Sequence, residues 1–153
     1  MSTDPNNTST ASNPVGRFMV AAGAVIELND TGKILLVQRS PTLDWHPSEW
    51  EITYGRIDQF EDVPTGLRRE VFEELGIREI TIHEVLRVWH IFRGSPKAEN
   101  ELIGITYHCR TSQEDVKVSA EHSQYRWVPA EEAAKLVSID GIREDVNAFL
   151  KLQ

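Results

Sequence analysis

Apolar residues along the chain follow two patterns, continuous runs and helical spacing, which predict different elements. An apolar run at 18–28 ends at the Asn-Asp-Thr-Gly cluster 29–32, and a second run, Lys33–Arg39, follows directly. Two such runs joined by a short turn of this composition predict a β-hairpin. Further strands are predicted at 51–54, 80–92, 102–110 and 123–128.

Between residues 62 and 75 the apolar positions follow the period of a helix. Asp62 is placed to cap its N-terminus, Pro64 falls in its first turn, and Gly76 is placed for the left-handed residue that ends it. Two more helices are predicted at 129–136 and 139–152, the second with an apolar stripe along one side. Strands before and after a central helix predict an α/β fold, with a mixed sheet and helices on both of its faces.

The length and composition limit the class of protein. A chain of 153 residues with 40% hydrophobic and 26% charged residues is one ordinary globular domain, which excludes a fibrous or wholly disordered chain. With 16 Lys and Arg against 24 Asp and Glu the net charge is −8, so we expect no nucleic-acid partner. A single cysteine excludes an internal disulfide framework and any zinc site with two cysteine ligands.

The start of the chain differs in composition from the rest. Residues 1–16 are rich in Ser, Thr, Asn and Pro and carry almost nothing to bury, which predicts a disordered tail followed by one folded domain at 17–153. The tail lacks the basic start and apolar centre of a secretory signal, so we expect a cytoplasmic location. The longest apolar stretch, 18–26, is far shorter than the roughly 20 residues of a membrane span, so no membrane partner is expected.

Three glutamates crowd one flank of the predicted central helix. At about 100° per residue, Glu70, Glu73 and Glu74 fall beside the apolar stripe rather than on the far solvent side. The stripe itself is formed by Leu67, Val71 and Leu75. Close to a sheet, at an effective dielectric near 20 and a separation of about 6 Å, each like-charged pair costs about 2–3 kcal/mol. Protonation, a cationic side chain or a metal ion must offset this repulsion.

Arg69, directly before the first of these glutamates, neutralises only part of the charge, because one arginine cannot balance three carboxylates. Carboxylate oxygens are ligands that suit Mg²⁺ or Mn²⁺, so a metal ion is one explanation of the cluster. A fully solvated acidic helix face is the ordinary alternative.

The spacing around this helix favours the metal-binding interpretation. Five residues separate Gly55 from Glu61, and seven more lead to the run Arg69-Glu70-Val71-Phe72-Glu73-Glu74-Leu75-Gly76-Ile77. This pattern resembles the Nudix box of the MutT-type hydrolases, G-x5-E-x7-R-E-U-x-E-E-x-G-U with U aliphatic, and every specified position matches. At average composition the probability of a chance match is on the order of 10⁻⁷. The resemblance extends over roughly residues 18–150.

The resemblance implies both a fold and a reaction. The fold is a Nudix-type α/β/α sandwich with a mixed central sheet and a loop–helix–loop active site. The reaction is the Mg²⁺- or Mn²⁺-dependent hydrolysis of a pyrophosphate bond in a nucleoside diphosphate linked to a group X, so the partner is a small nucleotide substrate. The protein is expected to be a monomer or a homodimer.

The resemblance also implies roles, position by position. Glu70, Glu73 and Glu74 match the metal-binding glutamates, and Glu70 is also a candidate general base. Glu121 matches a glutamate on a later loop that serves in some family members as the base or as a further metal ligand. Two other acidic residues compete with it for this role, Glu99 and Glu101.

Other residues of the box have supporting roles by the same resemblance. Arg69 holds a glutamate in orientation through charge-assisted hydrogen bonds. Glu61 contributes further hydrogen bonds or a site for a further cation. Gly55 and Gly76 allow the sharp turns that seat the helix.

Substrate contacts are expected from three further residues, Arg39, Tyr54 and Arg56. A guanidinium matches the geometry of a phosphate, which makes the two arginines, together with Arg87 and Arg93, candidate phosphate clamps. Many family members have Pro-Gly-Gly where this chain has Thr53-Tyr54-Gly55, so we expect Tyr54 to narrow or reshape the substrate pocket. Four aromatic residues are candidates for stacking on a base: Trp45, Trp50, Trp89 and Phe92.

Several alternatives stay open at this point. A weak resemblance to dihydroneopterin triphosphate pyrophosphatases favours a nucleoside triphosphate-like substrate, with dihydroneopterin triphosphate itself or an ADP-sugar as alternatives. A regulatory Nudix module that binds nucleotides without turnover usually has a damaged box, and this box is intact. Isomerase chemistry on isoprenyl diphosphates normally relies on a catalytic cysteine, for which Cys109, expected to be a packed and inert thiol, is the single candidate.

Overall fold

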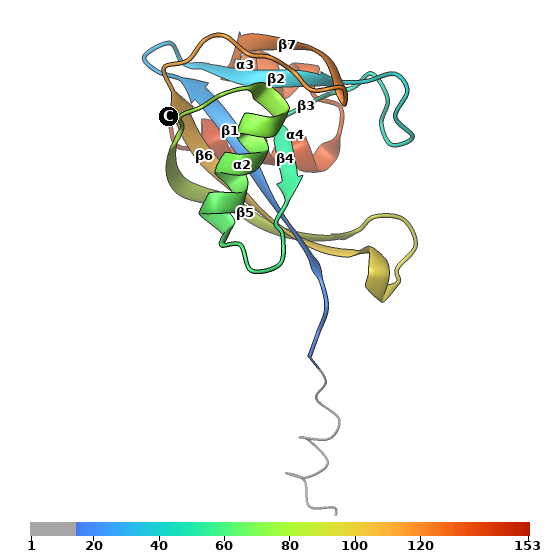
Figure 1. Cartoon of the computed structure of the whole chain (residues 1–153). Coiled ribbons are helices and arrows are strands. Elements are labelled where there is room, and N and C mark those ends of the chain that lie inside the picture. Colours follow the sequence, from blue (N-terminus) through green and yellow to red (C-terminus); the bar gives the residue numbers. More distant parts are fainter. Residues whose placement is uncertain (1–14) are drawn as a thin grey trace, which may run out of the picture.

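The computed structural model describes residues 15–153, and Figure 1 shows a central sheet with helices on both sides. The strands are β1 (Met19–Leu28), β2 (Lys33–Arg39), β3 (Trp50–Glu51), β4 (Thr53–Arg56), β5 (Thr81–Phe92), β6 (Glu101–Thr111) and β7 (His122–Pro129). The helices are α2 (Val63–Leu75), α3 (Ala130–Leu136) and α4 (Asp140–Leu150), with a 3-10 turn η1 (Ala98–Asn100). The predicted tail at 1–16 lies outside the described residues except for its last two, and the domain start at residue 17 stays a prediction.

β1 is the strand on which the mixed sheet is organised. It pairs in parallel with β6 along its whole length. Its other edge is divided between two antiparallel partners, β2 at the C-terminal end and β4 at the N-terminal end. β3 and β7 both pair with β2, and β5 pairs with β6 at the opposite edge of the sheet. The mixed sheet and the hairpin of β1 and β2 confirm the predicted arrangement.

The segment predicted as one strand at 51–54 is two short strands, β3 and β4, separated at Ile52. The chain changes partner at this residue, because β3 pairs with β2 whereas β4 pairs with β1. The side chain of Ile52 is fully buried there. The prediction of one continuous strand was wrong, since an apolar pattern does not show a change of partner. The change brings Gly55 beside Ala22 in β1.

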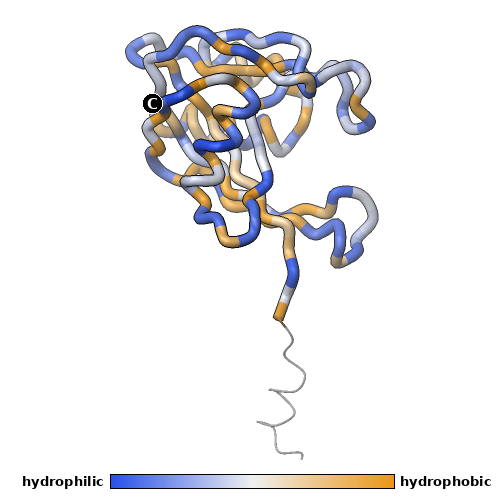
Figure 2. The backbone as a smooth tube through the Cα atoms, in the orientation of Figure 1, coloured by the Kyte–Doolittle hydropathy of each residue, from blue (hydrophilic) through white to orange (hydrophobic). Residues whose placement is uncertain are grey.

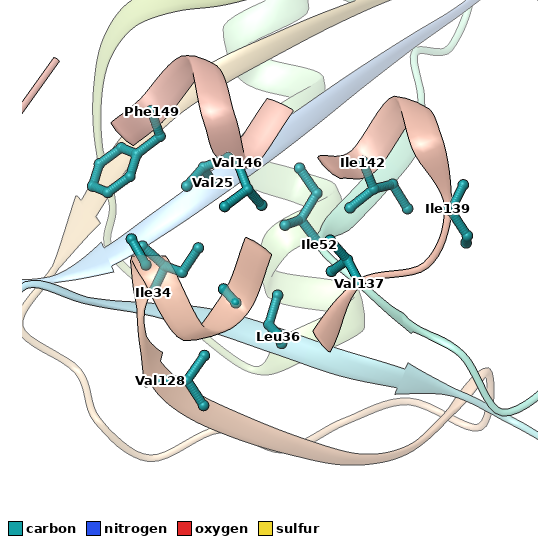
Figure 3. Close-up of a cluster of buried hydrophobic side chains, with 12 residues drawn as sticks. Val25, Ile34, Leu36, Ile52, Val128, Val137, Ile139, Ile142, Val146 and Phe149 are labelled. Carbon is teal, nitrogen blue, oxygen red and sulfur yellow. The ribbon is translucent and has the colours of Figure 1, made fainter. Parts of the chain in front are cut away.

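Two clusters of buried side chains, one on each face of the sheet, form the core. Figure 3 shows the first, between the sheet and helices α3 and α4, whose labelled members include Val25, Leu36, Ile52, Val146 and Phe149. The second lies under α2, which contributes Leu67, Val71 and Leu75. Figure 2 shows the hydrophobic stretches concentrated along the inner strands. Helices on both faces confirm the predicted α/β/α sandwich. Within residues 15–153 no helix is both long and apolar enough to cross a membrane.

Helix α2 begins and ends where the sequence predicts. The Asp62 carboxylate accepts a hydrogen bond from the Thr65 N–H at 2.9 Å, and Pro64 lies in the first turn. Gly76 ends the helix in the left-handed region, with φ 67°, and its N–H donates to the Phe72 carbonyl at 2.9 Å. These caps determine where the glutamates of the helix lie along the sheet.

Replacing Asp62 by Ala removes the side-chain acceptor at the start of α2. We expect the free energy of unfolding to fall by about 1 kcal/mol, because the Thr65 N–H loses its partner. Urea denaturation followed by circular dichroism measures this change. Asp62→Asn retains an acceptor and should stay within roughly 0.5 kcal/mol of the wild type, so equal losses in the two variants would contradict the capping role.

Candidate active site

The first glycine of the box lies directly against a glutamate side chain of α2. A Cβ atom at Gly55 would lie 2.0 Å from Cγ of Glu70 and 2.4 Å from its Oε2, distances that no real Cβ shows. Only glycine therefore leaves room for Glu70 at this place on β4. The contact positions the half-buried Glu70 carboxylate on the surface of the sheet.

Arg69 is the centre of an ion-pair cluster beside this contact. Its Nε and Nη2 donate to the two carboxylate oxygens of Glu61, both at 2.8 Å. Its Nη1 donates to Glu70 at 2.8 Å and to Glu73 at 3.2 Å, and Nη2 also donates to the Arg56 carbonyl at 3.0 Å. All five N–H groups of the guanidinium are used in this way. Arg69 thus joins the loop before α2 to two of the three helix glutamates.

The third glutamate, Glu74, is held from the other side, by the chain that leads into β7. The Ser119 hydroxyl donates to Oε2 of Glu74 at 2.7 Å, and Nδ1 of His122 lies 3.5 Å from the same oxygen. The other ring nitrogen of His122 lies 3.0 Å from Oε1 of Glu51, which also accepts from Nη1 of Arg39 at 3.0 Å. Sequence reasoning missed Ser119, His122 and Glu51 as site residues, because only the fold brings them to α2.

The negative charge of Glu70 is not fully offset by the side chains around it. Burial raises the pKa of Glu70, and the negative charges of Glu73 and Glu74 add to the effect, which outweighs the ion pair with Arg69. A further cation would stabilise the ionised form of such a group. A bound metal ion therefore fits the electrostatics at this position.

Glu74, in contrast, has a cationic side chain beside it. The adjacent His122 ring, followed by the Ser119 hydroxyl, lowers the pKa of Glu74. Burial alone would lower the pKa of His122, but Glu51 and Glu74 raise it to about 9, so the ring is charged at neutral pH. His122 is therefore a second cation of the site, beside Arg69, which the sequence predicted to offset only part of the charge.

Each of the three helix glutamates keeps one oxygen that makes no hydrogen bond to another part of residues 15–153. Arg69 contacts Oε1 of Glu70 and Oε2 of Glu73, while both contacts of Glu74 reach its Oε2. Three oxygen donors on one helix suit Mg²⁺ or Mn²⁺. As the side chains stand, however, no three His, Cys, Asp or Glu residues in the described part of the chain are placed to hold an ion. Metal binding therefore requires at least one glutamate to turn.

Tyr54, predicted to contact the substrate, lies on the opposite face of the sheet from these glutamates. Side chains alternate along β4, so that Gly55 faces α2 and Tyr54 faces α4. The Tyr54 ring packs edge-on against Trp89, with centroids 5.7 Å apart, and its hydroxyl donates to Asp145 of α4. Nε of Arg87 donates to the other oxygen of Asp145 at 2.6 Å. The structure thus places Tyr54 in a buried polar cluster behind the site.

Of the candidate phosphate clamps, Arg87 is paired with Glu144 and Asp145 of α4, and the two expected to contact substrate, Arg39 and Arg56, lie in different surroundings. Arg39 is paired with Glu51, and its Nε donates to the Trp45 carbonyl at 2.8 Å. The structure therefore connects Arg39 to the glutamates of α2 only through other side chains. Arg56 is exposed at the end of β4, and its carbonyl accepts from Arg69.

The later acidic residues are also separated by the fold. Glu121 lies exposed directly before β7, where its carbonyl accepts from the Ser40 N–H at 2.8 Å. Glu99 and Glu101 lie at the end of the hairpin of β5 and β6, which Figure 1 shows well away from α2. Glu101 is paired there with His90 at 2.7 Å. This placement favours Glu121 over its two competitors.

Cys109, the single candidate nucleophile for isomerase chemistry, is fully buried in β6. Burial raises the pKa of its thiol to about 12. A thiol that is protonated at neutral pH and closed to solvent does not act as a nucleophile, so the isomerase alternative loses its catalytic residue.

The three carboxylates of α2 suit a divalent cation, and a bound cation can assist the hydrolysis of a phosphoanhydride. The family model described as NUDIX domain matches residues 17–147, and the chain belongs to the Nudix hydrolase family, as the box predicts. Nudix enzymes hydrolyse pyrophosphate bonds and generally use a divalent metal ion.

Individual relatives agree with this assignment. The nucleoside triphosphatase NudI of Klebsiella pneumoniae is 29% identical over 114 residues, which are 69% of this chain and 79% of the relative. The dihydroneopterin triphosphate pyrophosphohydrolase of Escherichia coli has a TM-score of 0.73 at 22% identity, covering 88% of this chain and 96% of that chain. An Ap4A hydrolase of Caenorhabditis elegans, solved as a binary complex, has a TM-score of 0.69 at 25% identity, with coverage of 88% and 96%.

Glu61→Gln tests the ion pair at the centre of the Arg69 cluster. The hydrogen bonds from Arg69, and then the one from the Asp58 N–H, lower the pKa of Glu61 from 4.5 to about 2. A carboxyl group with a lowered pKa in the folded chain stabilises the fold above its unfolded pKa, and this contribution is lost as the pH falls through its folded pKa. We expect the wild type to be more stable than the variant at neutral pH, and the two to converge as the pH falls from 4.5 to about 2.

The measurement is urea denaturation of both proteins across this pH range. Glu131→Gln, at an exposed position of α3, controls for the loss of a surface charge. A stability difference between wild type and Glu61→Gln that stays constant from neutral pH to the acid limit would contradict the assignment.

Proposed function

We propose that the chain hydrolyses nucleoside triphosphates, or analogues with the same triphosphate group, at a pyrophosphate bond, with Mg²⁺ or Mn²⁺ as cofactor. The observation that carries this proposal is the carboxylate set of α2, in which Glu70, Glu73 and Glu74 each keep one oxygen for a cation. The relatives named nucleoside triphosphatase support a triphosphate over an ADP-sugar. A net charge of −8 also calls for a cation between the protein and a polyphosphate.

In this proposal the three helix glutamates hold the ion, which when bound supplies positive charge to the phosphate oxygens. Arg69 keeps Glu70 and Glu73 in orientation through hydrogen bonds that are already present. Water attacks phosphorus, its proton passes to a carboxylate, and the bond from phosphorus to the leaving phosphate oxygen breaks. Glu70 and Glu121 are the two candidates for the group that accepts the proton.

The arginines have different tasks in substrate binding. Arg56 is exposed beside the loop that carries Glu61, and is the clamp that can meet a phosphate directly. Arg39 remains paired with Glu51 and contributes its charge from behind the site. A cytoplasmic location, and a monomer or homodimer as the assembly, stay predictions from the sequence.

The test is a panel of phosphoanhydrides assayed with Mg²⁺ and again with EDTA. It contains nucleoside triphosphates, dihydroneopterin triphosphate, ADP-ribose and diadenosine tetraphosphate, so that one assay ranks the alternative substrates. We expect the highest kcat/KM with a nucleoside triphosphate and no turnover in EDTA. Tight nucleotide binding that is indifferent to EDTA, without turnover of any compound, would identify a binding module and overturn the proposal.

Glu74→Gln removes one proposed metal ligand. We expect kcat with the best substrate to fall by about a hundredfold or more, because the amide is a neutral and weaker donor to a hard cation. Steady-state kinetics at several Mg²⁺ concentrations measures the change. Glu131→Gln, an exposed glutamate of α3, is the matched control and should retain the wild-type kcat. A similar kcat in Glu74→Gln and the wild type would remove Glu74 from the metal site.

Gly55→Ala tests the contact between β4 and the helix. The added Cβ would meet the flexible side chain of Glu70, so we expect this side chain to turn away and kcat to fall by roughly tenfold or more, with little change in Tm. Gly104→Ala is the contrasting variant, because its Cβ would lie 2.0 Å from the Trp89 ring, which is held by a hydrogen bond to Thr106. That variant should lower Tm instead. An unchanged kcat in Gly55→Ala would show that the position of Glu70 does not matter for turnover.

A further inference from the structure

Alternating charges connect β2 to α2 behind the carboxylate cluster. Arg39 pairs with Glu51, Glu51 pairs with one nitrogen of the His122 ring, and the other ring nitrogen faces Glu74. The side chains of Glu51 and His122 are each 6% exposed and that of Glu74 is 16% exposed. Arg39 and the His122 ring therefore flank Glu51, and within residues 15–153 the histidine is the group that contacts both Glu51 and Glu74.

Backbone contacts fix the main chain of His122 relative to α2. His122 is paired with Arg39 in the register of β7 and β2, and its N–H donates to the Ser119 carbonyl at 3.1 Å. The preceding loop is bonded to the last turn of α2, since the N–H of Ser119 donates to the Glu74 carbonyl at 3.0 Å. The sheet and the helix end thus place the backbone of His122 so that its ring lies between Glu51 and Glu74.

Both neighbours of the Glu74 carboxylate lie beside the same oxygen, and the hydrogen bond to it comes from Ser119, since Nδ1 of His122 makes none within residues 15–153. The Ser119 hydroxyl and the His122 ring both approach Oε2, at 2.7 Å and 3.5 Å. Within residues 15–153, Oε1 of Glu74 accepts no hydrogen bond. A carboxylate held by one oxygen is oriented in advance to offer the other to a cation, which reduces the side-chain entropy lost on binding.

We propose that His122 is a positioning residue, which holds Glu51 and Glu74 in a fixed relation so that the metal-binding oxygen of Glu74 is presented correctly. This inference rests on the proposed function, in which Glu74 is a metal ligand. The inference adds that the metal affinity of the site depends on a histidine that contacts neither the metal nor the substrate. The ring also connects the metal site to Arg39, the cation on the far side of Glu51.

A purely structural role for His122 would have a different signature. A histidine between two buried glutamates stabilises the fold whether or not either glutamate binds a metal. The chain contains a comparable histidine on β6, where His108 contacts the buried Glu27 at 2.9 Å and the exposed Glu84 at 3.2 Å, on the face of the sheet that packs against α4. His108 is also buried, and its glutamates have no place in the proposed metal site.

The experiment compares His122→Gln with His108→Gln and the wild type. Glutamine nearly keeps the volume of the ring but does not bridge two carboxylates. Isothermal titration calorimetry with Mn²⁺ alone measures metal affinity without turnover, and circular dichroism measures Tm. We expect His122→Gln to raise the Kd for Mn²⁺ by about tenfold or more, and His108→Gln to change it by less than about twofold while lowering Tm.

Steady-state kinetics supplies a second reading. In His122→Gln the Mg²⁺ concentration for half-maximal rate should rise by the same factor as the Kd, while kcat at saturating Mg²⁺ recovers most of its wild-type value. Ser119→Ala removes the other donor to the same oxygen and should weaken Mn²⁺ binding in the same direction, by a smaller factor. It decides the question if His122→Gln does not fold, because Ser119 lies on the loop outside the sheet.

The outcomes distinguish a failure of the inference from a failure of the proposed function on which it rests. An unchanged Mn²⁺ affinity in His122→Gln with a lowered Tm would overturn the inference and leave the proposed function intact. An equal loss of affinity in His108→Gln would overturn it as well, because the effect would not be specific to the site. An unchanged affinity in Ser119→Ala, where only that variant folds, would also overturn it. A wild-type chain without Mn²⁺ uptake and without turnover would overturn the proposed function and the inference together.

Discussion

Carboxylates gathered at the edge of a sheet stay ionised only if cations stand beside them, and this constraint explains the arrangement of the site. Arg69 uses every N–H of its guanidinium on the loop before α2 and on two of its glutamates, while His122 faces the third. Each of the two cations contacts a single oxygen of every helix glutamate that it reaches. At Glu70, burial and the neighbouring glutamates raise the pKa despite the arginine. A metal ion would complete a balance that the side chains leave unfinished.

The course of the backbone makes that crowding possible. The segment Trp50–Arg56 pairs first with β2, as β3, and then with β1, as β4, and the buried Ile52 lies where the partner changes. This brings Gly55 under α2 at the height of Glu70, where any side chain larger than a hydrogen atom would occupy the same space. The helix is set in register with this glycine by its two caps, Asp62 and Gly76. The strict spacing of the box therefore reflects the fixed distances between β4, the loop that follows it and α2.

The sequence predicted most of this local geometry and little of what reaches the site from elsewhere. Period, caps and spacing lie within one stretch of chain, so α2, its buried stripe and the flank of its glutamates could be predicted from residues 55–77 alone. His122 and Glu51 are remote from Glu74 along the chain, and only the pairing of β2 with β3 and β7 brings them together. The orientation of Tyr54 could have been predicted from the sequence, because successive side chains of a strand point to opposite faces and Tyr54 is next to Gly55.

The buried cluster on the opposite face of the sheet also holds the site in place. Asp145 has no exposed surface, and a buried charge is tolerated only when it is paired and hydrogen-bonded, as it is here by Arg87 and by the Tyr54 hydroxyl. These contacts join α4 to β4 and β5, and Gly23 leaves room for the Tyr54 ring, since a Cβ there would lie 2.4 Å from it. Tyr54 is the direct neighbour of Gly55. The strand is therefore anchored from one face at the residue next to the one that Glu70 touches on the other, so that packing against α4 sets the position of a carboxylate on α2.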